Sequence, residues 1–486
     1  IENNHIDAII GLPANIFFGT GIPTIIMVLR QKRENTDVLI IDASKGFIKE
    51  GKNNKLRASD IKRIADTFIK RESIPKFSRV VSREEIRSND YNLNIPRYVD
   101  SSEAAEHWDV YASMFGGIPT AEIDEMSEFW TAFPALKKAL FTESGIPYVN
   151  VSTPDIKSAI KSNPDVVGFE NAFNAAFSTF PAFLKEELID RMGSIEISKA
   201  ETVLSADIFD RLKEIPLIDK YAAFQLLDDD WTGISIDLEM LQTEGFAATK
   251  KVDPNLVIKK KDGKDQEVQE GWVGHIIPFD LVQVTLLSTE TDELHGLESR
   301  LAEIPSEYES ILDEMTEEDK ESCNDVLTEE GDAFVPKEVS KKIKELKKDR
   351  SPESVALRTL LEKVESLVKS EKEIKAEIKA KSAALQAKTK DTIESLSDEQ
   401  ALDLLEKKWI APLIESIHKL PDTVIDSLVS KIQALQNKYA TTFFEVEQQI
   451  SETEATLSGM IDDLEGNEYD MLGLNELKKL LGGSAE

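Results

Sequence analysis

The sequence predicts three successive kinds of structure: an α/β segment at the N-terminus, a mainly α-helical region with a small β-hairpin element, and a C-terminal coiled-coil-like helical tail. Three observations predict this order. Short β-branched runs alternate with turns in residues 1–100, an Asp-Gly signal separates two extended runs near residues 255–282, and apolar residues recur at heptad spacing after residue 340. We therefore divide the chain into residues 1–100, 101–339 and 340–486.

The composition is that of a folded chain with several domains. Its 486 residues exceed what one hydrophobic core usually organises, and 41% hydrophobic residues beside 31% charged ones do not fit a disordered chain. The longest apolar runs, such as Ile22–Leu29, are shorter than the roughly 18–20 residues that span a bilayer. The single cysteine, Cys323, excludes intrachain disulfides and suits a reducing compartment. We expect a cytoplasmic protein without a membrane-spanning segment or a signal peptide.

The charge is unevenly distributed along the chain. Residues 1–100 contain 17 Lys and Arg against 13 Asp and Glu, a net charge of +4. Because the whole chain has a net charge of −33, residues 101–486 carry −37. Phosphate binding depends on Lys and Arg, so the overall acidity alone argues against nucleic acid. A mildly basic N-terminal segment followed by an acidic body is compatible with DNA contact through the first and protein contact through the second.

The first hundred residues predict strands followed by short helices. Ile9-Ile10 belongs to one strand, and Ile25–Leu29 and Val38–Ile41, which flank the charged turn Arg30–Asp37, predict a hairpin of buried strands. A basic loop over residues 45–57 leads to a helix that begins near Ser59. A further strand end at residues 80–81 leads to a short capped helix, and a proline in residues 89–100 predicts an extended exit from the domain.

Residues 101–339 are mainly helical by pattern. Breaks occur at 116–119, at Ile146-Pro147 and at Asn163-Pro164. Five phenylalanines between Phe169 and Phe183 predict a packed core rather than a ligand site. Leu256-Val257-Ile258 and Glu267-Val268 enclose an Asp-Gly pair at 262–263, which predicts a β-hairpin.

Long helices occupy residues 340–486. Seven of nine heptad core positions in the first helix are apolar, and these nine positions are Leu357, Leu360, Val364, Leu367, Glu371, Ile374, Ile378, Lys381 and Leu385. A second helix begins at Ser397, and a third runs through Ile425 and Tyr439 to Ile450. A single helix cannot bury such a seam, so it either folds back on another helix of the chain or takes a partner. The sequence leaves both possibilities open.

No motif in the chain predicts a catalytic, cofactor-binding or metal site. The five histidines lack metal-ligand spacing, and there is no Walker phosphate loop, HExxH or GxSxG motif. Gly19-Thr20-Gly21 is not the GxGxxG of dinucleotide-binding folds, because Thr24 stands at the last position. The turn at Ser162–Asp165 lacks the second proline and the aromatic of an Asn-Pro-Pro-aromatic motif.

Four segments carry a resemblance to a known family. They are LPANIFFGTGIPT at residues 12–24, VLIIDAS at 38–44, NDYNLNIPRYV at 89–99 and GWVGHIIPFDLV at 271–282. In this order and spacing they resemble the late part of the methyltransferase (modification) subunit of type I restriction-modification systems. The resemblance implies that residues 1–100 are the C-terminal end of a methyltransferase catalytic domain, and so the end of a Rossmann-like sheet.

The family's activity is transfer of a methyl group from S-adenosylmethionine to N6 of adenine in DNA. It implies DNA, a specificity subunit and a restriction subunit as partners, with residues 340–486 docking other subunits. The family's cofactor loop and Asn-Pro-Pro-aromatic motif, which precede these segments, are absent from the 486 residues. We therefore expect a C-terminal fragment that neither binds the cofactor properly nor methylates by itself.

The resemblance also implies candidate residues for DNA contact. Such enzymes flip the target base out of the duplex and hold it by stacking, and Phe18, with Phe17 and Thr24, best matches the position that packs on the base. The alternative is that the phenylalanines belong to the core. In the basic loop, cations that could contact phosphates are Lys45, Lys49, Lys52, Lys55 and Arg57, although a solvated surface loop has the same composition.

Two other functions are compatible with parts of the sequence. A coiled-coil interaction protein without enzymatic activity would use the helical tail alone. An acidic DNA mimic would need carboxylates spaced like phosphates on one face, which helices with interleaved lysines do not favour.

Overall fold

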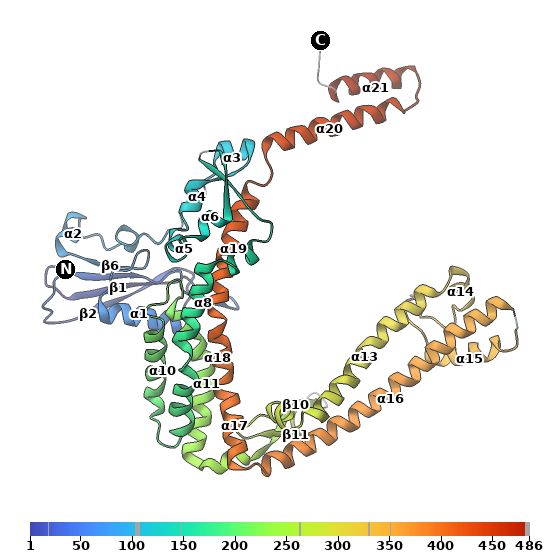
Figure 1. Cartoon of the computed structure of the whole chain (residues 1–486), viewed down its shortest axis with the longest axis horizontal. Helices are drawn as coiled ribbons and strands as arrows, with labels where there is room; N and C mark the ends of the chain where they lie inside the picture. Colours follow the sequence, from blue (N-terminus) through green and yellow to red (C-terminus); the bar gives the residue numbers. More distant parts are fainter. Residues whose placement is uncertain are drawn as a thin grey trace. The chain divides into compact units, whose positions relative to one another are not determined.

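The computed structural model of the chain comprises two compact units that interleave along the sequence (Figure 1). It describes residues 1–17, 19–102, 107–145, 147–261, 264–328, 331–349 and 351–481. Unit 1 consists of residues 1–184, 196–233 and 413–486, and unit 2 of residues 185–195 and 234–412. Among the described residues, no helix combines the length and apolar character needed to cross a membrane.

Unit 1 begins with a four-stranded sheet. Its strands are β1 (Ile6–Leu12), β2 (Thr24–Leu29), β3 (Val38–Asp42) and β6 (Ser78–Val81), in the order β2-β1-β3-β6. β1 and β3 are parallel, while β2 and β6 run antiparallel to their neighbours. β1 and β3 are buried almost throughout, as expected for central strands covered on both faces.

The expected hairpin between Ile25–Leu29 and Val38–Ile41 is wrong. β2 instead pairs with β1, with Leu12 opposite Thr24, and β3 lies on the other side of β1 with Ile41 opposite Ile10. The burial of the strands explains this order, because β3 is wholly buried and takes a central place, whereas β2 is mostly exposed and forms the edge. The two strands are adjacent in sequence but not in the sheet, which is why the expected pairing was wrong.

Helices cover both faces of this sheet (Figure 1). Successive strand residues point to opposite faces, so Ile10 and Ile41 pack with residues of α1 (Ala58–Lys70), such as Ile64. Ile9 and Ile40 pack on the other face, with Ile86 of α2 (Arg83–Ser88) and with the 3-10 helix η1 (Ile95–Arg97). The expected extended exit at residues 89–100 is therefore a segment that packs on the sheet, because Ile95, Tyr98 and Val99 are buried there.

A buried charge cluster stands at the start of β1. The Asp7 carboxylate, which is 3% exposed, lies 2.7 Å from Arg71 and 3.2 Å from each of Arg33 and Arg30. Arg71 also binds Asp37 at 2.6 Å. The cluster therefore joins the start of β1 to the segment before β3 and to the end of α1.

The rest of unit 1 is mainly helical, as expected, but residues 118–151 also form a small sheet that the pattern did not predict. Its strands are β7 (Ile118–Pro119), β8 (Phe141–Gly145) and β9 (Tyr148–Val151), in the order β7-β9-β8. The predicted break at Ile146-Pro147 lies between β8 and β9, although Ile146 is outside the described residues. The surrounding helices are α3 (Val110–Phe115), α4 (Thr120–Asp124), α5 (Ser127–Ala132), α6 (Leu136–Leu140), α7 (Ile156–Lys161), α8 (Pro164–Phe177), α9 (Phe180–Leu184), α10 (Ile197–Arg211) and the first part of α11 (Lys220–Glu244).

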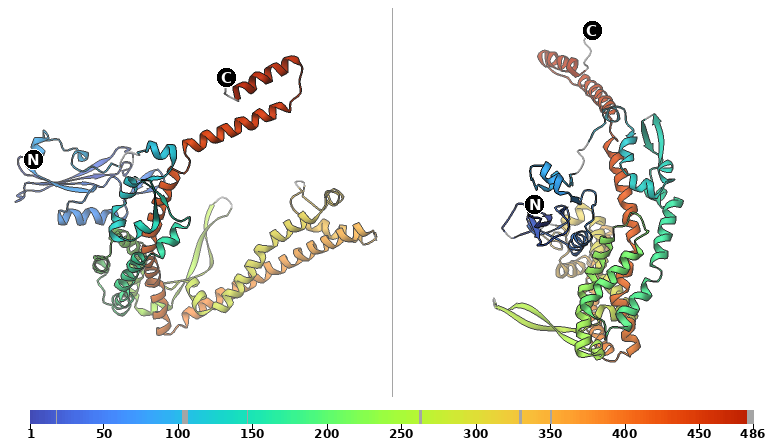
Figure 2. Two further views of the ribbon diagram at one scale, coloured as in Figure 1. Left: turned by 45° about the horizontal axis from the view of Figure 1, so that its top comes forward. Right: turned by 90° about the vertical axis from the view of Figure 1, so that its left-hand side faces the viewer.

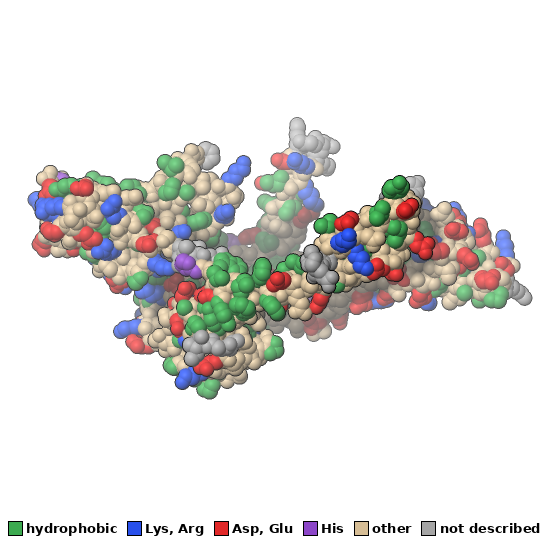
Figure 3. All heavy atoms as spheres, turned by 90° about the horizontal axis from the view of Figure 1, so that it is seen from above, with side chains coloured by type: hydrophobic (Ala, Val, Ile, Leu, Met, Phe, Trp, Pro, Cys, Tyr) green, Lys and Arg blue, Asp and Glu red, His purple; other side chains and the backbone are tan. Residues whose placement is uncertain are grey.

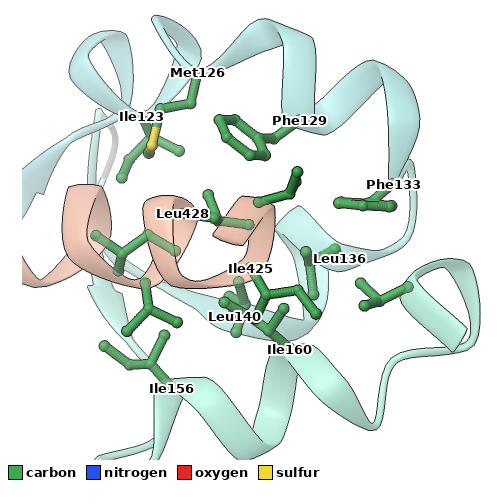
Figure 4. Close-up of a cluster of buried hydrophobic side chains, with 14 of the residues drawn as sticks. Ile123, Met126, Phe129, Phe133, Leu136, Leu140, Ile156, Ile160, Ile425 and Leu428 are labelled. Carbon is green, nitrogen blue, oxygen red and sulfur yellow. The ribbon is translucent and has the colours of Figure 1, made fainter. Parts of the chain in front are cut away.

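A C-terminal helix completes the core of these helices. α19 (Leu420–Lys438) brings Ile425 and Leu428 between side chains such as Phe129, Leu136 and Ile160 (Figure 4). Four of the five phenylalanines expected to pack a core are buried, and these are Phe169, Phe173, Phe177 and Phe180.

The helix expected to continue from Ile425 to Ile450 is two helices. α19 follows α18 (Ala411–His418) and ends at Lys438, and α20 (Phe443–Asp462) begins anew before α21 (Glu468–Leu481). The reason is local, because the Thr442 hydroxyl accepts from the Glu445 N–H at 3.1 Å and the Glu445 carboxylate accepts from the Thr442 N–H at 3.0 Å. Such a capping box starts a helix, and the heptad pattern does not reveal it.

Unit 2 contains the predicted β-hairpin. β10 (Val252–Lys261) pairs with β11 (Lys264–Gly274), with Val257 opposite Val268, and the two long strands form a ribbon (Figure 2, yellow-green). The hairpin is confirmed, while its predicted turn residues, Asp262 and Gly263, lie outside the described residues. Other elements of the unit are the π-helical η2 (Lys185–Asp190), the 3-10 helix η3 (Phe246–Lys250), α12 (Phe279–Leu286), α14 (Glu317–Ser322) and α17 (Asp398–Trp409).

The nine predicted heptad positions all lie in one helix, α16 (Pro352–Glu394), which packs on α13 (Ser288–Glu314) and α15 (Pro336–Leu346). We call these three helices the helical arm. Of the two possibilities left open by the sequence, α16 folds back on helices of its own chain. Its buried residues include Leu357, Leu361, Val364, Leu367, Ile374 and Leu385.

Polar residues interrupt the apolar contact between α13 and α16, and they form hydrogen bonds from one helix to the other. The Tyr308 hydroxyl of α13 lies 3.1 Å from the Glu371 carboxylate, and the Lys381 ammonium lies 2.7 Å from Glu293. Asp, Glu, Lys and Arg side chains are interspersed on the surface of the arm (Figure 3, right). This arrangement differs from the unbroken acidic face that a DNA mimic requires.

Candidate nucleic-acid interface

The loop between β1 and β2 contains the residues that sequence analysis assigned to the target base. It spans residues 13–23, and the Leu12–Thr24 strand pair closes its base. Asn15 and Gly19 adopt positive φ angles of 56° and 78°, so the chain turns twice within it. The Thr20 N–H donates to the Phe17 carbonyl at 3.2 Å and closes the turn at its tip.

The three candidate residues occupy different places in this loop. Phe17 lies at the tip with 55% of its surface exposed, so its ring is not part of the core. Phe18 lies outside the described residues. Thr24 lies at the base, where its hydroxyl oxygen is buried and has no hydrogen-bond partner within the described part of the chain.

The predicted basic loop forms a small hairpin that is tied to the Phe17 loop. β4 (Ile48–Glu50) pairs with β5 (Asn53–Lys55), and Gly51, with φ 63°, allows the tight turn. From β5, Asn54 donates its side-chain amide to the Ala14 carbonyl at 2.7 Å and its backbone N–H to the Asn15 carbonyl at 2.9 Å. Two hydrogen bonds therefore bring the predicted base-contacting loop and the predicted phosphate-contacting hairpin together.

The basic residues expected to contact phosphates differ in how their charge is used. Lys55 pairs with Glu50 at 3.2 Å, and Arg57 pairs with Asp60 at 2.9 Å at the start of α1. Lys49 and Lys52 are exposed and have no ion-pair partner in the portion of the chain that the structure describes. Of these four residues, Lys49 and Lys52 are therefore the ones that remain available to an anion.

A cavity of about 360 Å³ lies beyond the carboxyl end of β3. Four basic residues line it, and these are Lys45, Arg57, Arg63 and Lys76. Asp42 lies on its wall and is engaged, because it accepts from the Ser44 N–H at 3.0 Å and from the Ser101 hydroxyl. Asp60 also lines the cavity and pairs with Arg57, so the excess of positive charge comes from Lys45, Arg63 and Lys76, and it suits an anionic ligand.

Sequence reasoning missed two of these basic residues. Arg63 lies on α1, with its guanidinium 4.3 Å from the centre of the Phe77 ring, and Lys76 lies in the turn before β6. Neither belongs to the basic loop of residues 45–57, and only the folding of the sheet brings them to Lys45. Their single signal in the sequence is their charge.

A histidine of unit 2 has two acidic neighbours. His275 Nδ1 lies 2.6 Å from Asp253, and its Nε2 lies 3.1 Å from Glu244, so the hydrogen bond with Asp253 raises the pKa of the imidazole. Within the described residues, no group of three or more His, Cys, Asp or Glu side chains is placed to hold a metal ion. We interpret the histidine as a structural link at the base of the β10–β11 hairpin.

Comparison with known proteins relates the first part of the chain to one family. Residues 1–107 match the family described as N-6 DNA Methylase. A stretch of 111 residues is 37% identical to the type I restriction enzyme MpnII methylase subunit of Mycoplasma pneumoniae, covering 23% of this chain and 20% of that protein. The type I restriction enzyme HindI methylase subunit of Haemophilus influenzae is 30% identical over 178 residues, which are 35% of each chain.

A crystal structure of the type I restriction-modification system methyltransferase subunit from Streptococcus thermophilus is also similar. It is 51% identical over 21% of each chain, with a TM-score of 0.21. The matched part of this chain spans between a fifth and about a third of the length of the relatives given above.

Proposed function

We propose, from the premise that residues 1–107 belong to the N-6 DNA methylase family, that this chain is part of a DNA methyltransferase subunit of a type I restriction-modification system. The activity is transfer of a methyl group from S-adenosylmethionine to N6 of adenine, and the compartment is the cytoplasm. Similarity to type I methylase subunits of two bacteria supports this proposal. So does the resemblance of residues 271–282, far beyond the matched family segment.

In this proposal, the loop between β1 and β2 holds the flipped adenine. An aromatic face at the loop tip replaces the stacking that the base loses on leaving the duplex, and Phe18 with its exposed neighbour Phe17 would provide it. Lys49 and Lys52 on the adjoining hairpin would contact backbone phosphates, which positions the duplex without reading its sequence. The observation that carries the assignment is the pair of hydrogen bonds from Asn54, because it keeps the aromatic loop and the free cations together.

The cavity beyond β3 does not fit S-adenosylmethionine. The reacting group of that cofactor is a sulfonium cation, and Lys45, Arg63 and Lys76 would repel it, while the charge of Arg57 is paired with Asp60. The Asp42 carboxylate beside them is already engaged by Ser44 and Ser101. The 486 residues also contain no Asn-Pro-Pro-aromatic motif. We therefore propose that this chain by itself does not transfer methyl groups, and we assign no step of the transfer to it.

The helical parts of the chain would connect the methyltransferase to its complex. The partners in this proposal are the specificity subunit, which reads the DNA sequence, and the restriction subunit. Residues 101–486 carry a net charge of −37, whereas residues 1–100 carry +4. This acidic character supports protein contacts rather than DNA contacts for residues 101–486.

The experiment that tests the proposed function compares Phe18→Ala with Phe17→Ala in the whole methyltransferase complex. Loss of one base–aromatic stack costs about 1–3 kcal/mol, so Phe18→Ala should lower methylation about 5- to 150-fold and reduce the fluorescence of 2-aminopurine at the target position. Ile22→Ala, in the same exposed loop, is the matched control and should leave both unchanged. Unchanged methylation by both phenylalanine variants would remove this loop from the base site.

A further inference from the structure

The cavity beyond the carboxyl end of β3 collects cations that have no counter-ion in the fold. Its volume is about 360 Å³, and its wall includes Lys45 after β3, Arg63 of α1 and Lys76 before β6. Within the described residues, none of these three side chains forms an ion pair or a hydrogen bond. Like charges around one cavity repel each other, so an anion that enters it would stabilise the protein.

Aromatic rings, and not an acceptor, hold Arg63 in place. Its guanidinium carbon lies 4.3 Å from the centre of the Phe77 ring and 5.9 Å from that of the Tyr221 ring. Its Nε atom is buried and has no hydrogen-bond partner in the part of the chain that the structure describes. The rings therefore orient a guanidinium whose donors are unused, and the group that a guanidinium binds best is an oxyanion, through two parallel N–H donors.

Lys76 has a backbone conformation that residues with a Cβ atom rarely adopt. It follows Pro75 in the turn before β6, and its φ of 60° lies in the left-handed region that favours glycine. Lys32 shares this conformation, with a φ of 54°, but does not line the cavity. Strain of this kind can fix a side chain at a ligand site, and the comparison of the two lysines provides a test of that role.

The charge of the cavity wall matches a dianion. The wall carries a net charge of +2 from four basic residues and two carboxylates, which are Lys45, Arg57, Arg63, Lys76, Asp42 and Asp60. A phosphomonoester has a charge of about −1.5 to −2 near neutral pH and three acceptor oxygens. A phosphate of the DNA backbone carries about one negative charge. A monoester or inorganic phosphate therefore neutralises the wall more completely than a backbone phosphodiester does.

We propose that this cavity binds a phosphate dianion, either inorganic phosphate or the phosphate group of a small phosphomonoester. The Arg63 guanidinium donates to two phosphate oxygens, and the ammonium groups of Lys45 and Lys76 neutralise the remaining charge. The cavity volume lies near the lower end of the range for small-molecule sites, so the organic part of a monoester has to be small. This inference goes beyond the proposed function, because neither the flipped base nor methyl transfer involves this cavity.

The test is calorimetric titration of the 486-residue chain at constant ionic strength and about pH 8, where monoesters are dianions. Inorganic phosphate and methyl phosphate should bind saturably, and dimethyl phosphate, a monoanion like the DNA backbone, at least about fivefold more weakly. Tighter binding of methyl phosphate identifies an organic monoester as the source of the ligand, and the reverse order identifies inorganic phosphate. Absence of saturable binding, or equal binding of dimethyl phosphate, would overturn the proposal.

Variants of Arg63 locate the bound anion. Arg63→Met keeps a long side chain over Phe77 but removes the charge and the donors, so phosphate binding should weaken about tenfold or more. Arg63→Lys retains the charge without the paired donors and should recover part of the affinity. Lys49→Ala with Lys52→Ala, which removes the cations assigned to DNA, is the control and should leave phosphate binding unchanged. Equal affinity of Arg63→Met and the wild type would refute the site.

The two left-handed lysines separate a ligand role from a structural one. Lys76→Gly and Lys32→Gly both relieve the same backbone strain, so both variants should resist urea at least as well as the wild type. Phosphate binding should weaken about three- to tenfold in Lys76→Gly and stay unchanged in Lys32→Gly. Weakening in both variants, or in neither, would contradict the role of Lys76. A DNA duplex that displaces methyl phosphate from the Lys49→Ala, Lys52→Ala variant would make the backbone diester the occupant and overturn the choice of a dianion.

Discussion

The side-chain amide of Asn54 lies 2.7 Å from the carbonyl oxygen of Ala14, and this hydrogen bond connects two segments that are 40 residues apart. One segment exposes an aromatic ring and the other exposes free lysines. A nucleic-acid surface needs both, because cations supply most of the affinity while flat side chains engage a base. The position of the aromatic loop is thus set by a polar residue that contacts no DNA in our proposal.

Asn54→Ala should loosen the Phe17 loop without unfolding the sheet. It removes one of the two hydrogen bonds, worth about 0.5–1.5 kcal/mol, and keeps the bond from the Asn54 backbone N–H to Asn15. Amide hydrogen exchange of Thr20 should become faster, while exchange in β1 stays unchanged. Asn53→Ala, the neighbouring change on β5, is the control, and equal acceleration in both variants would contradict the coupling.

Lys49→Ala with Lys52→Ala should weaken DNA binding more than Lys55→Ala does. Each lost phosphate contact lowers the slope of log binding constant against log salt by about 0.9, so the double variant should lower it by about 1.8. Lys55 must first leave Glu50 to reach a phosphate, and its removal should change the slope less. Duplex binding measured at several salt concentrations checks this, and a larger effect from Lys55→Ala would reverse the assignment.

Asp7→Asn should destabilise the N-terminal sheet strongly. The change leaves Arg33, whose side chain is as buried as that of Asp7, without its carboxylate, and breaking such a pair costs about 3–5 kcal/mol. Glu50→Gln removes a carboxylate from an exposed pair and should cost about 0–1 kcal/mol. Amide exchange of β1 and β3 in increasing urea measures both, and similar costs would show that the buried cluster is not stabilising.

The base of the β10–β11 hairpin should be more stable in mild acid than in mild alkali. The hydrogen bond to Asp253 raises the pKa of His275 above its ordinary 6.5. The protonated form is therefore favoured in the folded state, and its stabilisation is complete below the unfolded pKa and is lost as the pH rises through the folded pKa. His275→Gln should lower protection of the strand amides at about pH 5.5 and have little effect at about pH 8.5.

His295→Gln, which removes a histidine from α13 elsewhere in unit 2, is the control variant for these measurements. A difference between wild type and His275→Gln that grows with rising pH would contradict the assigned direction of the pKa.

Sequence reasoning recovered the features that depend on local signals. The β10–β11 hairpin is an example, because alternating runs on either side of an Asp-Gly pair specify it within a short window. The family resemblance of the first hundred residues is confirmed by the match of residues 1–107. The assignment of the heptads to a helix was also correct, since all nine positions lie in α16.

The errors have a different origin, because each depends on contacts between distant residues or on a single cap. β2 and β3 look alike in sequence, and only the pairing of both strands with β1 shows that β1 lies between them. The break after Lys438 depends on Thr442 and Glu445, which a heptad pattern passes over. Arg63 and Lys76 reach the cavity beyond β3 only through the fold of the sheet.

The polar pairs across the helical arm limit how its two long helices can slide. Moving α13 by one heptad along α16 is a step of about 10.5 Å, and it would restore the heptad spacing of the two helices. The same step would carry Tyr308 away from Glu371 and Lys381 away from Glu293, leaving all four groups without the partners they have in the native register. The register of α13 on α16 is therefore fixed. A displacement at one end of the helical arm moves the other end as well, because the two helices do not slide past each other.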